Sequence, residues 1–594
     1  MKKYILLAVA VLMFGVANAK VIRIHYSDGT TKVYTSSELS TIDFNNNGTV
    51  TVYAYDGSLI PQPAGKIYES VTVDDQEAVT EYASHQLEGE VYGVTLGRRN
   101  VTAINMVYPS VDPANNSVSL SGTILIPDEI MNGEVESEGV ILVHHFTLLS
   151  KYNIPTRGYY DASVKFLFCN SLNLNYIVVV SDFYGFGATE RFPQAYLLGE
   201  ANARASLDAL KAARRILCNE GINCGPLTFN LGASSAGFDA MEALRVIQTR
   251  PGYESIHFDK TFAYAGPYDV KATFNHYIQQ DTTYYSVGMP IAMVSYKEHG
   301  FLSADYNTMF KPLIADHIDS WFLSKDYTSA QVLSFIGPYT PVSELLQPDY
   351  CSLNSTQTQA MLNMLGSHSV TATGWVPDTN HRIFLMHSHG DEFVPFVATR
   401  RMLDFLTSAG YKKSIIPGRT NLQTNVVNQR LGHASAGAVF MIQTMAAMKA
   451  WPLMYSDDEL NPYYDSLAHR DLDVVGTMRQ LDEMGFDCRQ LIRDVMDASG
   501  DDTSSSGEID IISVMERMDE AGIDLALLME ILDDSGINSF QLLLDLIVYL
   551  TENSNEGAEG GLDMAINRML DVEHDPNALP MQRYAYQLMR TFKE

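Results

Sequence analysis

The sequence predicts an α/β core, in which a mostly parallel sheet is covered by helices, with a small β module before it and an all-helical module after it. Three observations point to this organisation. Short alternating strand patterns fill residues 20–75, buried strand patterns alternate with helical ones over residues 76–452, and strand patterns end beyond Pro452. Alternating strands and helices are typical of a doubly wound sheet, whereas helices alone indicate a separate unit.

The composition is that of a folded protein with more than one domain. The chain has 594 residues, of which 46% are hydrophobic and 19% are charged, and this length exceeds that of one ordinary domain. The formal net charge of −31 argues against a nucleic-acid partner, because Lys and Arg supply most of the affinity for phosphate groups. The acidic residues are most concentrated after Asp501.

Residues 1–19 have the features of a secretory signal peptide. Lys2 and Lys3 precede an apolar run over residues 4–16, and the segment ends in small residues at Ala19. The apolar run is shorter than a membrane span requires. We therefore expect cleavage after Ala19 and a secreted protein, periplasmic or extracellular, with no transmembrane anchor.

The segment 20–75 is predicted to be a small module of repeated β-hairpins. Two alternating stretches, KVIRIHY and TVTVYAY, are each followed by an Asp-Gly pair, at Asp28-Gly29 and Asp56-Gly57. Asp-Gly is a preferred turn sequence in β-hairpins. Nothing in this module suggests an active site.

The core, residues 76–452, contains the strand patterns GVILVHH, YIVVVSD, LTFNLG, KTFAYAG and RIFLMHSHGD. The stretches ARASLDALKAARRIL and AGFDAMEALRVIQ have helical periodicity. A hairpin is predicted around Asn115-Asn116. Residues 271–380 interrupt the alternation with a segment rich in Tyr, Phe and Met. That segment is too long for a loop, so we expect an inserted lid that lines an acyl pocket.

The stretch LGASSAGFDA contains two adjacent serines at a predicted strand-to-helix turn. A nucleophilic serine in such a turn requires small residues two positions to either side. Both Ser234 and Ser235 satisfy this requirement. We favour Ser234, because Gly232 directly follows the strand and Gly237 allows close packing of the helix. Ser235 as the nucleophile, and a helix N-cap without chemistry, remain as alternatives.

An acid and a base follow the serines in an informative order. Asp391 lies in a polar turn after an apolar strand, and His433 lies in a Gly-flanked loop before a long apolar helix. A serine, an acid and a histidine in this chain order, at the ends of successive strands, are typical of one class of hydrolytic triad. The serine hydroxyl needs such a base to remove its proton.

Two further motifs complete a family resemblance. VILVHHFTLLS resembles the oxyanion stretch of the α/β-hydrolase superfamily, with His145 where that superfamily usually has glycine. SDFYGFGATE resembles its Asp-x-x-Gly-x-Gly turn, which here begins at Asp182. Residues 76–452 therefore resemble an α/β-hydrolase of the secreted esterase or lipase type.

The resemblance implies a role for each matching residue. Ser234 would be the nucleophile, His433 the base and Asp391 the acid that orients the base. The backbone N–H groups of Phe146 and Ser235 would form the oxyanion hole. The expected activity is that of a secreted serine hydrolase that cleaves a small-molecule or lipid-like carboxylic ester through an acyl-enzyme, with no cofactor.

Two other functions fit the same pattern. An exopeptidase of this fold would have an identical serine turn. A non-catalytic secreted binding protein that kept the hydrolase fold is also consistent with the sequence, because fold does not dictate function.

Residues 453–594 are predicted to form an acidic module of helical repeats. The segments VVGTMRQLDEMGFDCRQLI and IISVMERMDEAGIDLALLM align with each other. We expect this module to bind a protein partner. The oxygen side chains of residues 497–508 resemble a calcium loop, but Asp502 stands where that loop needs glycine.

No metal site is predicted elsewhere. His387 and His389 alternate along a strand end and lack a third ligand nearby. Cys218 and Cys224 are close enough in sequence to form a disulfide, but the sequence alone does not decide whether they do.

Overall fold

A computed structural model describes residues 21–449, except for 36–37, 46, 64, 75–76, 92–93, 158–173, 415–420 and 428–430. The predicted signal peptide, the helical module 453–594 and the calcium-like segment 497–508 lie outside the described residues. The chain divides into two compact units. Of the described residues, the first unit contains those up to Ile383 and Asp391–Tyr411, and the second contains Phe384–Gly390 and those from Lys412 to Lys449.

The N-terminal part of the first unit contains two small antiparallel sheets. Their strands are β1 (Val21–Tyr26), β2 (Thr31–Thr35), β3 (Thr41–Phe44), β4 (Val50–Tyr53), β5 (Leu59–Ile60) and β6 (Tyr68–Asp74). The strand orders are β2-β1-β6 and β3-β4-β5. Gly29 and Gly57 adopt φ angles of 84° and 81° in the two turns, which glycine tolerates readily. The hairpins predicted from the two Asp-Gly pairs are confirmed.

The main sheet of the first unit positions the candidate site. Its strands are β7 (Ala78–Val91), β8 (Val94–Val111), β9 (Ser117–Pro127), β10 (Gly139–Val143), β11 (Tyr176–Ser181), β12 (Leu227–Ala233) and β13 (Lys260–Tyr264). The strand order is β13-β12-β10-β11-β9-β8-β7. Strands β10 to β13 are parallel, and β7, β8 and β9 add an antiparallel edge. The hairpin predicted at Asn115-Asn116 joins β8 to β9.

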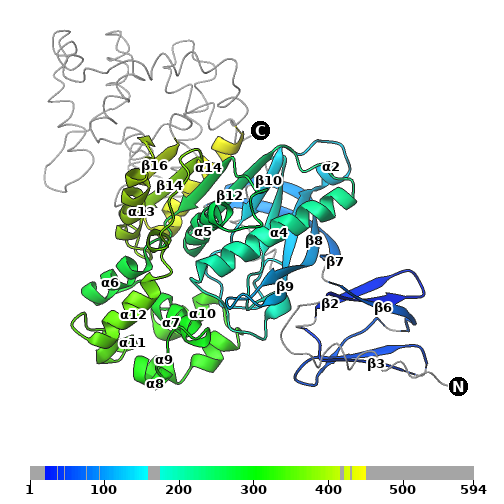
Figure 1. Cartoon of the computed structure of the whole chain (residues 1–594), viewed down its shortest axis with the longest axis horizontal. Helices are drawn as coiled ribbons and strands as arrows, with labels where there is room; N and C mark the ends of the chain where they lie inside the picture. Colours follow the sequence, from blue (N-terminus) through cyan, green and yellow to red (C-terminus); the bar gives the residue numbers. More distant parts are fainter. Residues whose placement is uncertain are drawn as a thin grey trace, which may run out of the picture. The chain divides into compact units, whose positions relative to one another are not determined.

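Two long helices cover one face of this sheet. They are α4 (Gly199–Asn219) and α5 (Ser235–Thr249), which pack against each other over the strands (Figure 1). A short helix, α2 (Asp128–Met131), follows β9, and a 3₁₀ turn, η1 (Gly187–Thr189), follows β11. Cys218, in the last turn of α4, and Cys224 are free thiols in this structure.

The inserted segment 271–380 is helical, and its helices lie together in the green region of Figure 1. They are α6 (Val270–Gln280), α7 (Gly288–Glu298), α8 (Tyr306–Met309), α9 (Pro312–Ala315), α10 (Ser329–Ile336), α11 (Val342–Leu345) and α12 (Thr356–Gly366), with a π-helix, η2 (Ile318–Leu323), and two 3₁₀ turns, η3 (Pro348–Tyr350) and η4 (Val370–Ala372). We call this segment the lid. Helix α13 (Val397–Ser408) packs against α6.

The second unit contains most of β14 (Ile383–Ser388), with β15 (Lys413–Ser414), β16 (Leu422–Val427) and α14 (His433–Lys449). Its strand order is β15-β16-β14. The Phe384 ring on β14 stacks on Phe440 of α14, with 5.7 Å between ring centroids. Among the described residues of the whole chain, every helix is too short or too polar to cross a membrane.

Candidate active site

Ser234 occupies the single position between β12 and α5. Its backbone has φ 61° and ψ −131°, a region that L-residues rarely adopt and that is concentrated at functional sites. Its N–H donates a hydrogen bond to the Tyr264 carbonyl at 2.8 Å, which fixes the turn to β13. This is the geometry of a strained strand-to-helix turn that presents a serine side chain.

Small residues around Ser234 allow this turn to form. A Cβ atom at Gly232 would overlap the Ala236 carbonyl oxygen, and one at Gly237 would press on the Tyr264 carbonyl. Ala236 is fully buried. Of the two adjacent serines, Ser234 is the one in the strained turn, and Ser235 begins the helix.

The Ser235 hydroxyl belongs to a cluster beside the turn. It accepts a hydrogen bond from the Thr147 hydroxyl at 3.0 Å, and the Thr147 hydroxyl lies 3.0 Å from the hydroxyl of Tyr196. The N–H of Ser235 lies in the first turn of α5, where backbone N–H groups lack an intrahelical acceptor. That N–H is one of the two donors that the sequence predicts for the oxyanion hole.

The loop after β10 carries His144, His145 and Phe146. The His144 N–H donates to the Leu231 carbonyl at 2.9 Å, which continues the pairing with β12. Its ring lies between two polar side chains: Nε2 is 2.8 Å from Asn230 Oδ1, and Nδ1 is 3.0 Å from the Ser206 hydroxyl. Burial lowers the pKa of His144 to about 4. The ring is therefore neutral near pH 7 and acts as a structural hydrogen-bonding group.

His145 directs its side chain toward the turn that follows β11. Its Nε2 lies 3.2 Å from the Asp182 carbonyl oxygen, and its ring packs at a tilt against Phe183, with 4.2 Å between centroids. Its Nδ1 lies 2.9 Å from the Phe146 carbonyl oxygen. His145, at a position where glycine is usual, thus connects the Phe146 loop to the turn that follows β11.

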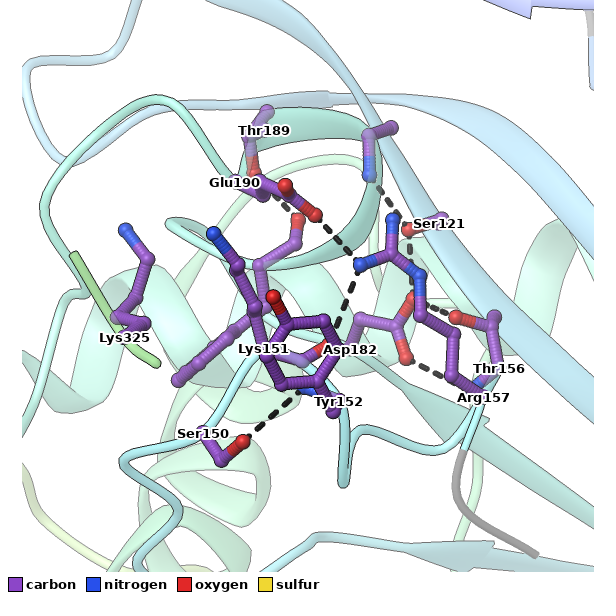
Figure 2. Close-up of polar contacts among 12 residues, drawn as sticks. Ser121, Ser150, Lys151, Tyr152, Thr156, Arg157, Asp182, Thr189, Glu190 and Lys325 are labelled. Atoms are coloured by element: carbon purple, nitrogen blue, oxygen red, sulfur yellow. Dashed lines mark hydrogen bonds and ion pairs between the residues drawn. The ribbon is translucent and has the colours of Figure 1, made fainter. Parts of the chain in front are cut away.

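Asp182 holds the other end of this loop (Figure 2). Its buried carboxylate accepts hydrogen bonds from the Ser121 hydroxyl at 2.6 Å, from the Thr156 hydroxyl at 2.7 Å and from the Thr156 N–H at 3.0 Å. Burial raises the pKa of Asp182. Gly187 lies against this group, and a Cβ atom there would overlap the Ser121 hydroxyl. The Asp-x-x-Gly-x-Gly turn is therefore a structural anchor.

Asp391 lies in the first unit, in the turn after β14. Its Oδ1 accepts the N–H groups of Phe393 at 2.9 Å and Val394 at 2.8 Å. Tyr277 of the lid helix α6 donates its hydroxyl hydrogen to the Phe393 carbonyl. Burial, and then the negative charge of Asp391, raise the pKa of Tyr277. The lid therefore packs on the turn that carries the proposed acid.

His433 lies in the second unit, at the start of α14, and is buried. The loop before it is held by the Ser388 hydroxyl, which donates to the Leu431 carbonyl at 2.5 Å. Ser234, Asp391, Phe146 and Ser235 all lie in the first unit. Asp391 lies in the turn after β14, as the sequence predicts, whereas His433 is the first residue of α14 and does not lie in the loop before it.

Comparisons with known proteins identify the fold. No protein-family profile and no curated protein matches the sequence. A candidate hydrolase from Legionella pneumophila is structurally similar, with a TM-score of 0.54 at 15% identity, covering 64% of this chain and 100% of that one. The rice cell wall degrading esterase LipA from Xanthomonas oryzae has a TM-score of 0.50 at 19% identity, covering 64% of this chain and 98% of that one. The chain has an α/β-hydrolase fold.

A small cavity of about 20 Å³ adjoins the residues expected to form an oxyanion hole in this α/β-hydrolase fold. Phe146, Ser235, Gln194, Asn202 and Asp239 contribute to its wall. Among the described residues, Gln194 Nε2 and Asn202 Oδ1 have no hydrogen-bond partner. The cavity has room for about one water molecule, which these two atoms could hold.

Several residues of the site carried no usable sequence signal. Thr147 and Tyr196 join Ser235 through hydroxyl contacts between distant segments. Asp239 is buried on α5, where burial raises its pKa well above the ordinary value, and it accepts a hydrogen bond from Asn202 at 3.2 Å. The only sequence signal for these residues was the carboxyl group of Asp239, which lies on the helix that follows Ser234. Among the described residues, no group of three potential metal ligands occurs.

Lys325 of the lid is the most deeply buried lysine near the Phe146 loop. Its side chain is 1% exposed, and its ammonium group donates to the Phe192 carbonyl at 2.7 Å. Burial lowers the pKa of Lys325 to about 8, while Glu190 and Asp326 partly oppose this effect and Lys151 adds to it. Figure 2 shows Lys151, Glu190 and Lys325 in the same region.

The burial of Lys325 predicts a specific pH dependence of stability. Between pH 8 and the ordinary lysine pKa of 10.5, the unfolded state binds a proton that the folded state lacks. The contribution of Lys325 to the free energy of unfolding is therefore fully present at high pH, where the lysine is neutral in both states, and it is lost as the pH falls through 8. Relative to a Lys325→Met variant, the wild type should gain up to roughly 3 kcal/mol between pH 7.5 and 10.5.

Melting temperatures of both proteins across that pH range measure the effect. Lys412→Met, at an exposed lysine, is the matched control. A constant difference between wild type and Lys325→Met at every pH would contradict the prediction.

Proposed function

We propose that this chain is a secreted serine hydrolase that cleaves carboxylic esters. The observation that carries the proposal is the backbone of Ser234, with φ 61° and ψ −131° at the turn between β12 and α5. A strained serine at this point of an α/β-hydrolase fold supports a nucleophilic role. The similarity to LipA, an esterase, supports the ester bond as the target.

In the proposed mechanism, Ser234 Oγ attacks the ester carbonyl carbon while His433 removes its proton. Asp391 orients His433 and stabilises its positive charge. The N–H groups of Phe146 and Ser235 bind the oxyanion of the tetrahedral intermediate. The intermediate collapses as His433 protonates the departing alcohol, and water then releases the acyl group from Ser234 by the reverse sequence of proton transfers. Residues 1–19 direct the protein out of the cytoplasm.

A fluorophosphonate probe tests the proposal directly, because it phosphonylates an activated serine. The mature protein should be labelled once, at Ser234, and Ser235→Ala should still be labelled. Folded wild-type protein that resists labelling would instead favour the binding-protein alternative. Esters and aminoacyl anilides assayed side by side separate an esterase from an exopeptidase.

The chain-length dependence of ester hydrolysis provides another prediction. If apolar lid residues line the acyl site, each buried CH₂ group should favour the bound transition state by about 0.8 kcal/mol. The value of kcat/KM should then rise about fourfold per CH₂ until the pocket is full. Initial rates on p-nitrophenyl esters of graded chain length measure this, and a flat profile would show that the lid merely packs on the core.

A further inference from the structure

A segment of the lid, Lys325–Ser329, lies along the Phe146 loop. The Lys151 N–H donates to the Lys325 carbonyl at 2.8 Å, and the Ser329 hydroxyl donates to the Thr147 carbonyl at 3.3 Å. The later lid residue meets the earlier loop residue, so the two segments run antiparallel. We call residues 325–329 the lid strap.

Both ends of the lid strap are fixed. At its start, Asp326 forms an ion pair with Lys151, with Nζ and Oδ1 3.0 Å apart. At its end, Thr328 caps helix α10: its hydroxyl accepts the Gln331 N–H at 3.2 Å, and the Gln331 side chain accepts the Thr328 N–H at 2.8 Å. Such reciprocal capping orders the start of a helix. Ser329, the next residue, is therefore held against Thr147.

A second lid residue, Tyr285, reaches the same point. Burial raises its pKa, and side-chain hydrogen bonding with Ser329 and Thr147 opposes that rise. Its ring also packs at a tilt against Phe393, with 5.2 Å between centroids. Thr147 thus receives contacts from Ser235 and Tyr196 of the core and from Ser329 and Tyr285 of the lid.

We propose that Ser329 and Tyr285 of the lid are positioning residues for the oxyanion hole, acting through Thr147 on the adjacent Phe146 N–H. This inference rests on the proposed function. Thr147 directly follows Phe146, and the lid contacts hold its carbonyl, so they restrict the backbone torsions that connect Thr147 to the Phe146 N–H. A donor that is misdirected stabilises the oxyanion less, although substrate still binds. The lid would therefore contribute to the chemical step as well as to substrate access.

The test is a comparison of Ser329→Ala and Tyr285→Phe with wild type on a short soluble ester. Loss of one direct oxyanion donor lowers kcat by about 10²–10³, so indirect misalignment should lower kcat by about 10-fold with little change in KM. Ser334→Ala is the matched control, because Ser334 is exposed on the same helix and its hydroxyl bonds within that helix. Ser329→Thr, which keeps the hydroxyl, should restore most of the rate.

An inhibitor readout separates positioning from a general structural effect. A trifluoromethyl ketone forms a tetrahedral oxyanion on the serine, so its affinity should fall in step with kcat/KM in both lid variants. A ground-state ketone that forms no adduct should bind them all equally. In the Thr147→Val background, Tyr285→Phe should cause little further loss, because the contact that it removes is already absent.

The outcomes distinguish the inference from the proposed function. Wild type that hydrolyses esters, with Ser329→Ala and Tyr285→Phe at normal kcat, would overturn the inference alone. A rise in KM at normal kcat would also overturn it, because it would place these residues in substrate binding. If the wild type were not labelled by the fluorophosphonate, neither the proposed function nor the inference about the lid would stand.

Discussion

Ser234→Ala is expected to lower kcat by about four to six orders of magnitude, because no other group can form the acyl-enzyme. The alanine lacks the hydroxyl but keeps the small side chain that the turn requires. Steady-state hydrolysis of a p-nitrophenyl ester measures the loss. Adding His433→Ala should cause little further loss, because members of a triad act as one unit.

Ser235→Ala is the matched control, since it removes the hydroxyl contact to Thr147 but retains the backbone N–H. A loss of about tenfold or less is expected, in line with one indirect contact. If Ser235→Ala were inactive and Ser234→Ala active, the nucleophile would be Ser235. If both retained normal turnover, the proposed triad would be wrong.

Asp182→Ala is expected to cause a large loss of stability. The variant would leave the Ser121 hydroxyl and the hydroxyl and N–H of Thr156 without their buried acceptor. Unsatisfied buried donors cost about 1–3 kcal/mol each, so a total loss of roughly 3 kcal/mol or more is expected. Urea or thermal unfolding, followed by tryptophan fluorescence, measures it.

Asp112→Ala provides a matched control for Asp182→Ala. The Asp112 carboxylate also accepts three hydrogen bonds, from the N–H of Ala114 and from the N–H and side chain of Asn116, but it lies in an exposed turn. Water can replace those bonds, so a loss near 1 kcal/mol is expected. Equal losses in the two variants would show that burial of Asp182 contributes nothing to its importance.

Local sequence patterns predicted much of the fold. Buried runs such as GVILVHH became parallel strands, because both faces of an inner strand are covered by other residues. Asp28-Gly29 and Asp56-Gly57 predicted hairpin turns because glycine readily adopts a positive φ. Gly232 and Gly237 predicted a tight turn at Ser234, since a Cβ atom at either position would meet backbone atoms. These features depend on a residue and its near neighbours.

The remaining features depend on contacts between distant parts of the chain. Ser329 meets Thr147 across a separation of 182 residues, and no periodicity predicts such an encounter. The positive φ of Phe183, 66°, falls on a residue type that gives no local signal. The position of the His145 ring on Phe183 was also not predictable, because it depends on the path of the turn after β11. The triad residues stay predictions until the variants are measured.

The backbone of Ser234 has a consequence for laboratory evolution. A φ of 61° with a ψ of −131° is a conformation that glycine adopts freely, whereas another residue in such a region bears about 1–3 kcal/mol of strain. A change to glycine would relieve that strain and at the same time remove the nucleophilic hydroxyl. Libraries of this chain that are sorted for thermal tolerance alone would therefore enrich inactive sequences at position 234. Sorting for turnover in every round would prevent that drift.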